Sequence, residues 1–390
     1  MEEESGQNWN AKHDKLAGMM TGNNFKRIVV KLGTSTLTAG TSYLSPPHIV
    51  ELVRQMAALY QQGHEIILVS SGAMSAGRER LAFPKLPKEI PAKQMLSAVG
   101  QPRLMALYEQ LFGLYSLTVA QVLLTRNDLA NRRSYLNSRN TLAALLQQGV
   151  VPVVNENDTI TTEEIRLGDN DNLSALVANL IEADLLVMLT DQPGLYTADP
   201  RQDAKAELVH DVKEAAIPGW LWEAAGGTVN GLGTGGMVTK LGAADLARRA
   251  GTEVVIGDGR HPDILLKLVK GAAIGTRFTP LVTSLEGRKR YILAGSSAQG
   301  TLFVDAGAAH ALKKGGSLLP VGVAQILGEF ERGDTVCIVD PEQQEIARGL
   351  VNYSSLHLTK IQGQQSDTIE SILGFAYGDW VIHHNDMVIL

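Results

Sequence analysis

Residues 28–35, Ile28-Val29-Val30-Lys31-Leu32-Gly33-Thr34-Ser35, join a β-branched strand pattern to a glycine turn. A helix pattern follows, with apolar residues on one face from Ile49 to Tyr60, and Gly63 ends it before an apolar strand at 65–69. The alternation continues to about residue 278, with further strands expected at 119–124, 150–154, 184–189 and 253–256. This order is typical of α/β proteins, so we predict a mainly parallel sheet sandwiched by helices.

The composition indicates a globular protein large enough for more than one domain. The chain has 390 residues, 44% hydrophobic and 19% charged, so it can bury large cores at about 150 residues per domain. Its net charge of −6 argues against nonspecific binding to nucleic acid or anionic membranes. The single cysteine, Cys337, cannot form an internal disulfide, and the apolar runs are too short to span a membrane. We therefore expect a cytoplasmic protein.

The sequence predicts two domains after a loose N-terminal extension. Residues 1–24 contain no apolar segment of the signal-peptide kind, so we leave them out of the fold. The α/β pattern occupies residues 25–279. From residue 280 to 390, short strand patterns with glycine turns dominate, and one clear helix pattern lies at 306–314. This part is predicted to form a second, smaller β-rich domain.

Glycine-containing segments lie where predicted strands end and where a helix begins. Residues 31–35 and 70–73 follow the first two strands, and residues 234–240, TGGMVTK, open a helix pattern. In an open parallel sheet such positions lie along the carboxyl edge, where backbone N–H groups and helix N-termini bind phosphate oxygens. Lys31 and Lys240 could neutralise a nucleotide's phosphates there. The alternative for Lys31 is a strand-end lysine that reaches solvent.

Two clusters of carboxylates and amides follow other strands. Residues 155–158 read NEND, and residues 168–172 read GDNDN before another helix pattern. Such residues are favoured in turns and at helix N-caps, which is the simpler explanation. At one edge of the sheet they could instead bind the ammonium group of an amino-acid substrate and orient the lysines. Thr190-Asp191 ends a strand at the same edge and could either contact a nucleotide or form a turn.

A dinucleotide-binding motif can be weighed and set aside. Residues 231–236, GLGTGG, match the Gly-x-Gly-x-x-Gly pattern, and Asp258 lies at a suitable distance for a ribose-binding acid. The pattern requires a strand directly before the glycines, but residues 222–230 contain no apolar run. Met237 occupies the position of the P-loop lysine, and the Gly-x-Ser-x-Gly motif of hydrolases does not occur in the sequence. NAD binding, P-loop chemistry and serine hydrolysis are therefore disfavoured.

The order and spacing of these segments resemble the motif series of the amino acid kinase family. The similarity extends over residues 25 to about 278, and its most specific parts are GDNDNLSA at 168–175 and GLGTGGM-x-TK at 231–240. The C-terminal part resembles the PUA module, which is named for pseudouridine synthases and archaeosine transglycosylases. The resemblance implies an amino acid kinase-like domain followed by a small PUA-like domain.

The resemblance also implies an activity and its residues. It implies transfer of the ATP γ-phosphoryl group to the γ-carboxylate of L-glutamate, the first step of proline biosynthesis, with Mg²⁺ accompanying ATP and no protein metal ligand assigned. Lys31 and Lys240 match the phosphate-binding catalytic lysines, and Asp171 matches the residue that holds them. The substrate positions are Ser71, Asp158 and Asn170. The nucleotide positions are Lys31, Thr190, Asp191, Thr234, Gly235, Gly236, Met237, Val238, Thr239 and Lys240.

Other partners and functions follow less directly from the sequence. By the same resemblance we expect a homo-oligomer and feedback inhibition by proline. One alternative is a sibling kinase that acts on another carboxylate, a carbamate or a nucleotide. Another is an RNA-binding protein that uses the C-terminal module. Residues 284–390 contain eight Lys and Arg against twelve Asp and Glu, a net charge of −4, which argues against RNA binding.

Overall fold

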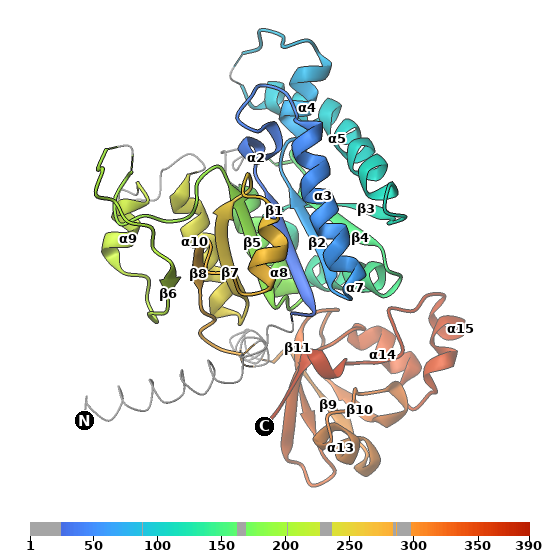
Figure 1. The fold of residues 1–390 in the computed structure, drawn as a ribbon. Coiled ribbons are helices and arrows are strands. Elements are labelled where there is room, and N and C mark those ends of the chain that lie inside the picture. Colours follow the sequence, from blue (N-terminus) through green and yellow to red (C-terminus); the bar gives the residue numbers. More distant parts are fainter. Residues whose placement is uncertain are drawn as a thin grey trace, which may run out of the picture. The chain divides into compact units, whose positions relative to one another are not determined.

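The chain forms two compact units in the computed structural model (Figure 1). The model describes residues 25–390, except residues 88, 162–168, 201, 227–235, 284–285 and 287–297. The predicted extension at 1–24 lies outside this part. Among the described residues, the first unit contains those up to 125 together with those in 143–248 and 252–280. The second unit contains the described residues of 281–390 together with 126–142 and 249–251.

The first unit is built on a mainly parallel sheet, which confirms the predicted fold class. Neighbouring strands are parallel from β3 to β7, and β8 runs antiparallel to β7. Among the described residues the sheet has eight strands, in the order β3 (Val119–Leu124), β4 (Val151–Glu156), β2 (Glu65–Ser70), β1 (Arg27–Leu32), β5 (Leu185–Thr190), β7 (Glu253–Asp258), β8 (Thr276–Phe278) and β6 (Asp211–Val212). The carboxyl ends of its parallel strands therefore share one edge.

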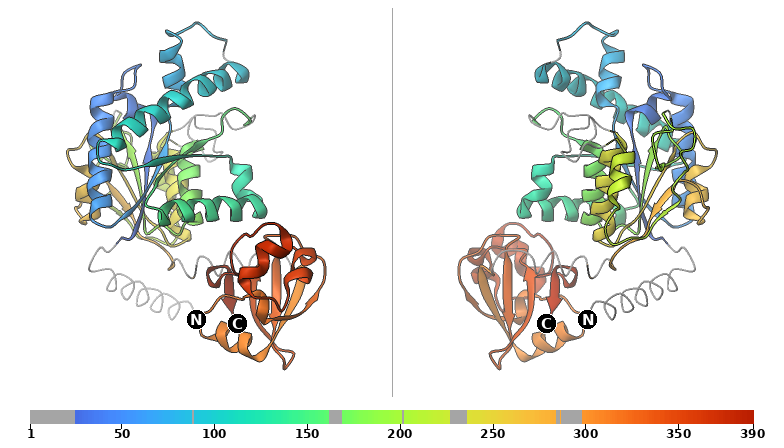
Figure 2. Two further views of the ribbon diagram at one scale, coloured as in Figure 1. Left: turned by 90° about the vertical axis from the view of Figure 1, so that its right-hand side faces the viewer. Right: turned by 90° about the vertical axis from the view of Figure 1, so that its left-hand side faces the viewer.

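Helices cover both faces of this sheet, as Figure 2 shows. Alternate residues of β1, such as Ile28 and Val30, form a buried core with α3, α5 and α11. The helix α8 contacts β1, β2, β4 and β5. The described helices of this unit are α2 (Thr34–Thr38), α3 (Pro46–Gln61), α4 (Ala73–Arg80), α5 (Ile90–Gly113), α8 (Asp169–Leu180), α9 (Gly219–Ala224), α10 (Met237–Arg249) and α11 (Ile264–Val269). None of the helices in the described part of the chain is long and apolar enough to cross a membrane.

Two glycines allow α4 and α5 to cross at close range. A Cβ atom on Gly100 of α5 would lie 1.8 Å from the carbonyl oxygen of Ala73, and one on Gly77 of α4 would lie 1.9 Å from that of Leu96. No side chain fits at either position, so the two backbones are in direct contact. Because α4 begins immediately after the strand end at β2, this crossing brings α5 next to the carboxyl edge of the sheet.

The second unit has its own mixed sheet and its own core, which confirms the predicted β-rich domain. The sheet order is β10 (Val323–Leu327), β9 (Gly300–Val304), β11 (Thr335–Val339), β12 (Glu345–Leu350) and β13 (Met387–Ile389), with only β9 and β11 parallel among these pairs. Its described helices are α6 (Arg126–Ala130), α13 (Ala306–Lys313), α14 (Ser355–Ile361) and α15 (Ile369–Leu373), together with α7 (Arg132–Gln147) as far as residue 142. Within this unit, Leu136 of α7 packs against Leu350 and Val388, and Arg139 forms an ion pair with Asp386. The segment 126–142 therefore belongs to this unit although it precedes residue 280.

Candidate active site

A buried carboxylate lies between the two lysines that the sequence analysis selects. Asp171 Oδ1 is 2.5 Å from Lys31 Nζ, and Asp171 Oδ2 is 3.2 Å from Lys240 Nζ. The hydroxyl of Thr239 also donates a hydrogen bond to Asp171 Oδ2, at 2.6 Å. Lys31, Asp171 and Lys240 are 3%, 1% and 9% exposed, so the alternative of a solvent-facing Lys31 is wrong.

This Lys31–Asp171–Lys240 triad carries one positive charge in excess. Burial raises the pKa of the Asp171 carboxyl, but the charges of the two lysines outweigh that effect, so the pKa lies below its usual value. Burial lowers the pKa of Lys31, which Asp171 opposes and Lys240 reinforces. An anion bound beside the triad would neutralise the excess charge and offset part of the cost of burying it.

Three elements bring the triad to the carboxyl edge of the sheet. Lys31 lies near the end of β1 and alternates with the core residues of that strand, so it faces α8. Asp171 lies in the first turn of α8, and Lys240 lies in the first turn of α10. The N-terminal ends of both helices carry partial positive charge, which favours anions at this edge.

A hydrogen bond joins Asn170 to Ser71, and both are predicted substrate residues. Asn170 Nδ2 donates to Ser71 Oγ at 3.0 Å and to Asn155 Oδ1 at 3.1 Å. The other amide atom, Asn170 Oδ1, is buried and has no hydrogen-bond partner among the described residues. A buried acceptor without a partner is costly, so this oxygen is suited to a ligand that donates a hydrogen bond.

Asp158, the third predicted substrate residue, is held by a different element. Its Oδ2 accepts a hydrogen bond of 2.7 Å from Ser97 of α5. Burial raises the pKa of the Asp158 carboxyl, and the hydrogen bond from Ser97 partly offsets that rise. A cation bound next to Asp158 would stabilise the ionised form.

The polar face of α5 was not predicted to belong to the site. Gln94, Ser97, Gln101 and Tyr108 bond in turn to Thr161, Asp158, Asn155 and Ser70. The spacing of three, four and seven residues places these side chains on one side of a helix. Polar residues at this spacing along the helix were the available sequence signal.

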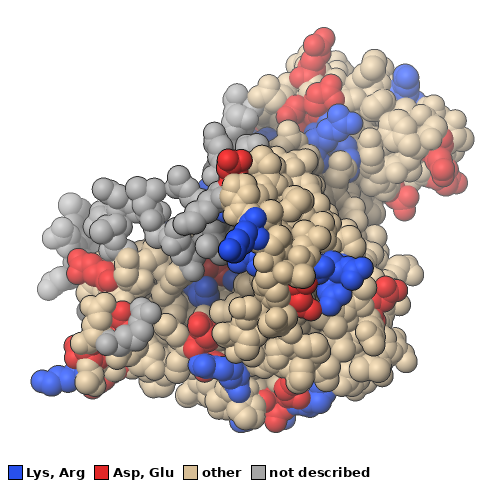
Figure 3. Space-filling model, turned by 90° about the horizontal axis from the view of Figure 1, so that it is seen from above, with Lys and Arg blue, Asp and Glu red and all other residues tan. Residues whose placement is uncertain are grey.

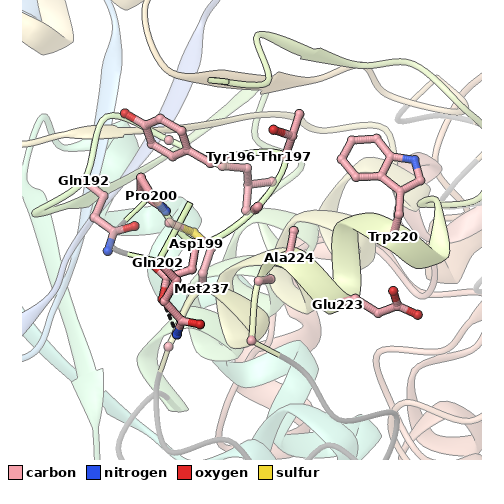
Figure 4. Close-up of a pocket in the computed structure, with 16 residues that line it drawn as sticks. Gln192, Tyr196, Thr197, Asp199, Pro200, Gln202, Trp220, Glu223, Ala224 and Met237 are labelled. Atoms are coloured by element: carbon pink, nitrogen blue, oxygen red, sulfur yellow. Dashed lines mark hydrogen bonds between the residues drawn. The ribbon is translucent and has the colours of Figure 1, made fainter. Parts of the chain in front are cut away.

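A cavity of about 720 Å³ lies between the loop after β5, α9 and the start of α10 (Figure 4). Tyr196 and Trp220 supply aromatic walls, and Gln192 and Asp199 supply polar groups. The predicted nucleotide residues Gly236 and Met237 line it, and Lys240 lies one helical turn further along α10. Of the other predicted nucleotide residues, Thr239 donates a hydrogen bond to Asp171 of the triad, and Val238 lies between Met237 and Thr239 on α10. Thr234 and Gly235 lie outside the described residues.

Hydrogen bonds hold the predicted nucleotide residues Thr190 and Asp191 at the end of β5, and one of them comes from Arg260. Thr190 donates to Asp191 Oδ1 at 3.1 Å, and the Arg260 guanidinium donates to the Asp191 carbonyl oxygen at 2.5 Å. Arg260 also forms an ion pair of 2.8 Å with Asp258. The last described element before the glycines at 231–236 is the helix α9, not a strand, which further disfavours the dinucleotide motif.

Charged side chains are scattered over the face that bears α2. Figure 3 views the molecule from the end at which α2 lies in Figure 1. Among the residues that Figure 3 colours, basic groups lie singly or beside acidic groups and form no continuous basic patch.

The described residues do not form a metal cage. They contain no group of three or more His, Cys, Asp and Glu placed to hold an ion. One oxygen of Asp171, the carboxylate at the centre of the site, forms an ion pair with Lys31, and the other accepts hydrogen bonds from Thr239 and Lys240. A divalent ion at this site would depend mainly on ligands from a nucleotide and water.

This fold and site define an enzyme that transfers a phosphoryl group without a P-loop. The chain belongs to the amino acid kinase family, whose model matches residues 26–258, and a PUA domain model matches residues 300–373. Both parts of the resemblance seen in the sequence are thereby confirmed.

The curated relatives of this chain match it over nearly its whole length. It is 53% identical over 367 residues to the glutamate 5-kinase of Shewanella amazonensis, covering 94% of this chain and 96% of that protein. It is 54% identical over 364 residues to the glutamate 5-kinase of Photobacterium profundum, covering 93% and 96%. Among solved structures, a UMP kinase from Bacillus anthracis aligns at a TM-score of 0.45 and 14% identity, covering 66% of this chain and 96% of that one.

Proposed function

We propose that this protein is an ATP-dependent kinase that transfers the γ-phosphoryl group of ATP to the γ-carboxylate of L-glutamate. The products are L-glutamyl 5-phosphate and ADP, and the acyl phosphate enters proline biosynthesis. The observation that carries the assignment is the 53% identity to a glutamate 5-kinase over 94% of the chain. The site chemistry agrees, because it pairs a cationic half with an acceptor-rich half.

The main physical obstacle in this reaction is the repulsion between two anions. A carboxylate is already a nucleophile at neutral pH, so the enzyme needs no general base. Catalysis then depends on placing the two anions in line and neutralising the charge on the transferring group. The excess positive charge of the triad supports a role for Lys31 and Lys240 at the phosphates, with Asp171 holding both lysines in place.

The acceptor-rich half is suited to the amino-acid end of glutamate. Asp158 supplies a carboxylate, and Asn170 Oδ1 supplies a buried acceptor that has no partner among the described residues. Both groups complement an α-ammonium group, which donates hydrogen bonds and is positive. The hydroxyl of Ser71, bonded to Asn170, completes this half.

The nucleotide is proposed to occupy the cavity between the loop after β5 and α10. The nucleoside would lie against Tyr196 and Trp220, and the phosphates would extend along the start of α10 to Lys240. Mg²⁺, when bound with ATP, would neutralise phosphate charge. No residue of this chain is assigned to it.

Three further properties belong to the same proposal. The protein is cytoplasmic, it assembles from copies of itself, and proline inhibits it. Light scattering of the purified chain and initial rates at increasing proline concentrations test the last two. The net charge of −4 in residues 284–390 supports the prediction that RNA is not a partner.

One assay tests the activity directly. Hydroxylamine traps an acyl phosphate as a hydroxamate, whose formation should require both ATP and L-glutamate. N-acetyl-L-glutamate keeps the γ-carboxylate but has no ammonium group, so it should not be a substrate. Aspartate, whose side chain is one methylene group shorter, tests whether the site requires the length of glutamate. Hydroxamate from another carboxylate but none from glutamate would assign the chain to a sibling kinase.

A further inference from the structure

A chain of amides runs from α5 into the proposed glutamate site. Gln101 Nε2 donates to Gln121 Oε1 at 3.0 Å, and Gln101 Oε1 accepts from Asn155 Nδ2 at 2.8 Å. Asn155 Oδ1 in turn accepts from Asn170 Nδ2 at 3.1 Å. Each amide in this relay uses its oxygen to hold the nitrogen of the next.

A backbone group fixes the direction of the relay. The N–H of Glu156 donates to Asn155 Oδ1 at 2.9 Å, and a backbone N–H can only donate. The oxygen of Asn155 must therefore face Glu156 and Asn170, and its nitrogen must face Gln101. Since Asn155 presents an acceptor to Asn170, the nitrogen of Asn170 must lie on that side.

The relay ends at the atom that faces the substrate. With its nitrogen bonded to Asn155 and Ser71, Asn170 has only its oxygen left, and this is the buried acceptor without a partner among the described residues. Rotation of the Asn170 amide would place N–H groups there instead. An ammonium group would then meet a donor and lose its hydrogen bond.

We infer that Gln101 is a positioning residue for the amino-acid substrate, because it holds Asn155 and, through it, the substrate-facing oxygen of Asn170. This inference rests on the proposed function, which places an ammonium group at Asn170. Gln101 and Asn155 are 8% and 2% exposed, so little water is available to replace the bond between them. Without the Gln101 oxygen, the buried Asn155 N–H group has no acceptor, so Asn155 is held less firmly and the oxygen of Asn170 is no longer kept in one position.

The test replaces Gln101 with methionine, which keeps the length of the side chain and removes the acceptor. Q101M should raise the KM for L-glutamate about tenfold and leave the KM for ATP within about twofold. Q101E keeps an acceptor for Asn155, and the exposed Gln121 can turn to donate to it, so this variant should restore most of the glutamate KM. Q110M makes the same change on the exposed side of α5 and is the matched control.

Each outcome bears on the inference. A raised glutamate KM in Q101M that Q101E rescues supports it. A normal glutamate KM in folded Q101M overturns it, as does an equal rise in both KM values. If Q101M does not fold, Q101N, which withdraws the oxygen by one methylene, should show the same selective rise, and its absence also overturns the inference. If the wild-type protein forms no hydroxamate from glutamate, the proposed function fails and the inference fails with it.

Discussion

Replacement of Asp171 by asparagine tests the arrangement in which two lysines share one carboxylate. Asparagine has the same shape and keeps one oxygen, but it removes the negative charge that lies 2.5 Å from Lys31 Nζ and 3.2 Å from Lys240 Nζ. The excess charge of the buried triad rises from +1 to +2. Because the triad is buried, the protein should respond by releasing a proton from one lysine.

The effect of D171N on the pKa of Lys31 follows from the contact between Lys31 and Asp171. Burial already lowers the pKa of Lys31, and Asp171 is the main group that opposes this decrease. A hydrogen bond to a charged group is worth about 1.5–3 kcal/mol, so the charged form of Lys31 should lose stabilisation of about that size. The pKa of Lys31 should therefore fall further below its usual value. A lysine is positive below its pKa, so D171N loses the charge at lower pH, and the alkaline decline of kcat should move to lower pH.

The assay is ADP release at saturating ATP and L-glutamate across a pH series. E109Q, a carboxylate-to-amide change on the exposed side of α5, is the control and should keep the wild-type profile. Circular dichroism and the melting temperature establish that D171N is folded. A folded D171N with normal kcat and an unshifted alkaline decline would show that Asp171 does not set the charge of the lysines.

Four other substitutions give distinct expectations. Lys31→Ala and Lys240→Ala should each lower kcat about 10²-fold or more at saturating ATP, and near-normal turnover would remove that lysine from the proposed mechanism. Asp158→Ala should raise the KM for glutamate about tenfold or more, with little change for ATP, because it removes the partner of the ammonium group; equal changes would contradict this role. Gly100→Ala should lower the free energy of unfolding by about 1–3 kcal/mol in urea, because its Cβ would meet a carbonyl oxygen of α4 at 1.8 Å. Gly113→Ala, where a Cβ meets open space, is the control, and equal stability of the two variants would contradict the close crossing.

Most of the α/β fold was predictable because its strands are short apolar runs between clear breakers. The strand expected at 119–124 is observed at Val119–Leu124, and that expected at 65–69 is observed at Glu65–Ser70. The strands β6 and β8 have two and three residues, too few to produce a period in the sequence. Their pairing with each other and of β8 with β7 joins residues that are distant in the chain, which a local sequence pattern does not reveal.

The catalytic candidates were also accessible from the sequence, for a topological reason. Parallel strands end at one edge, so residues that follow different strands meet there even when they are far apart in the chain. Lys31, Asp171 and Lys240 meet in this way. The catalytic roles of these three residues are predictions, but their proximity follows from the strand ends and the glycine turns.

The contribution of α5 was not predictable by the same reasoning. Gln101 and Ser97 lie in the interior of a helix, away from any strand end, and their partners Asn155 and Asp158 are 54 and 61 residues further along the chain. The close crossing of α4 and α5 determines which face of α5 meets the site. Likewise, the packing of Leu136 against Leu350 assigns 126–142 to the second unit, and nothing local in its helix pattern indicates this.

The first turn of α8 explains how one site can bind two kinds of group. Asn170 and Asp171 are consecutive, and consecutive side chains on a helix point about 100° apart. Asn170 therefore turns toward Ser71 and Asn155, and Asp171 turns toward Lys31 and Lys240. The acceptor that is proposed to face the substrate ammonium, and the carboxylate that holds the two lysines proposed to bind phosphate, are thus fixed to the same turn. The spacing between the proposed glutamate and phosphate positions is set by backbone geometry, so a change that displaces this turn should impair the binding of both substrates together.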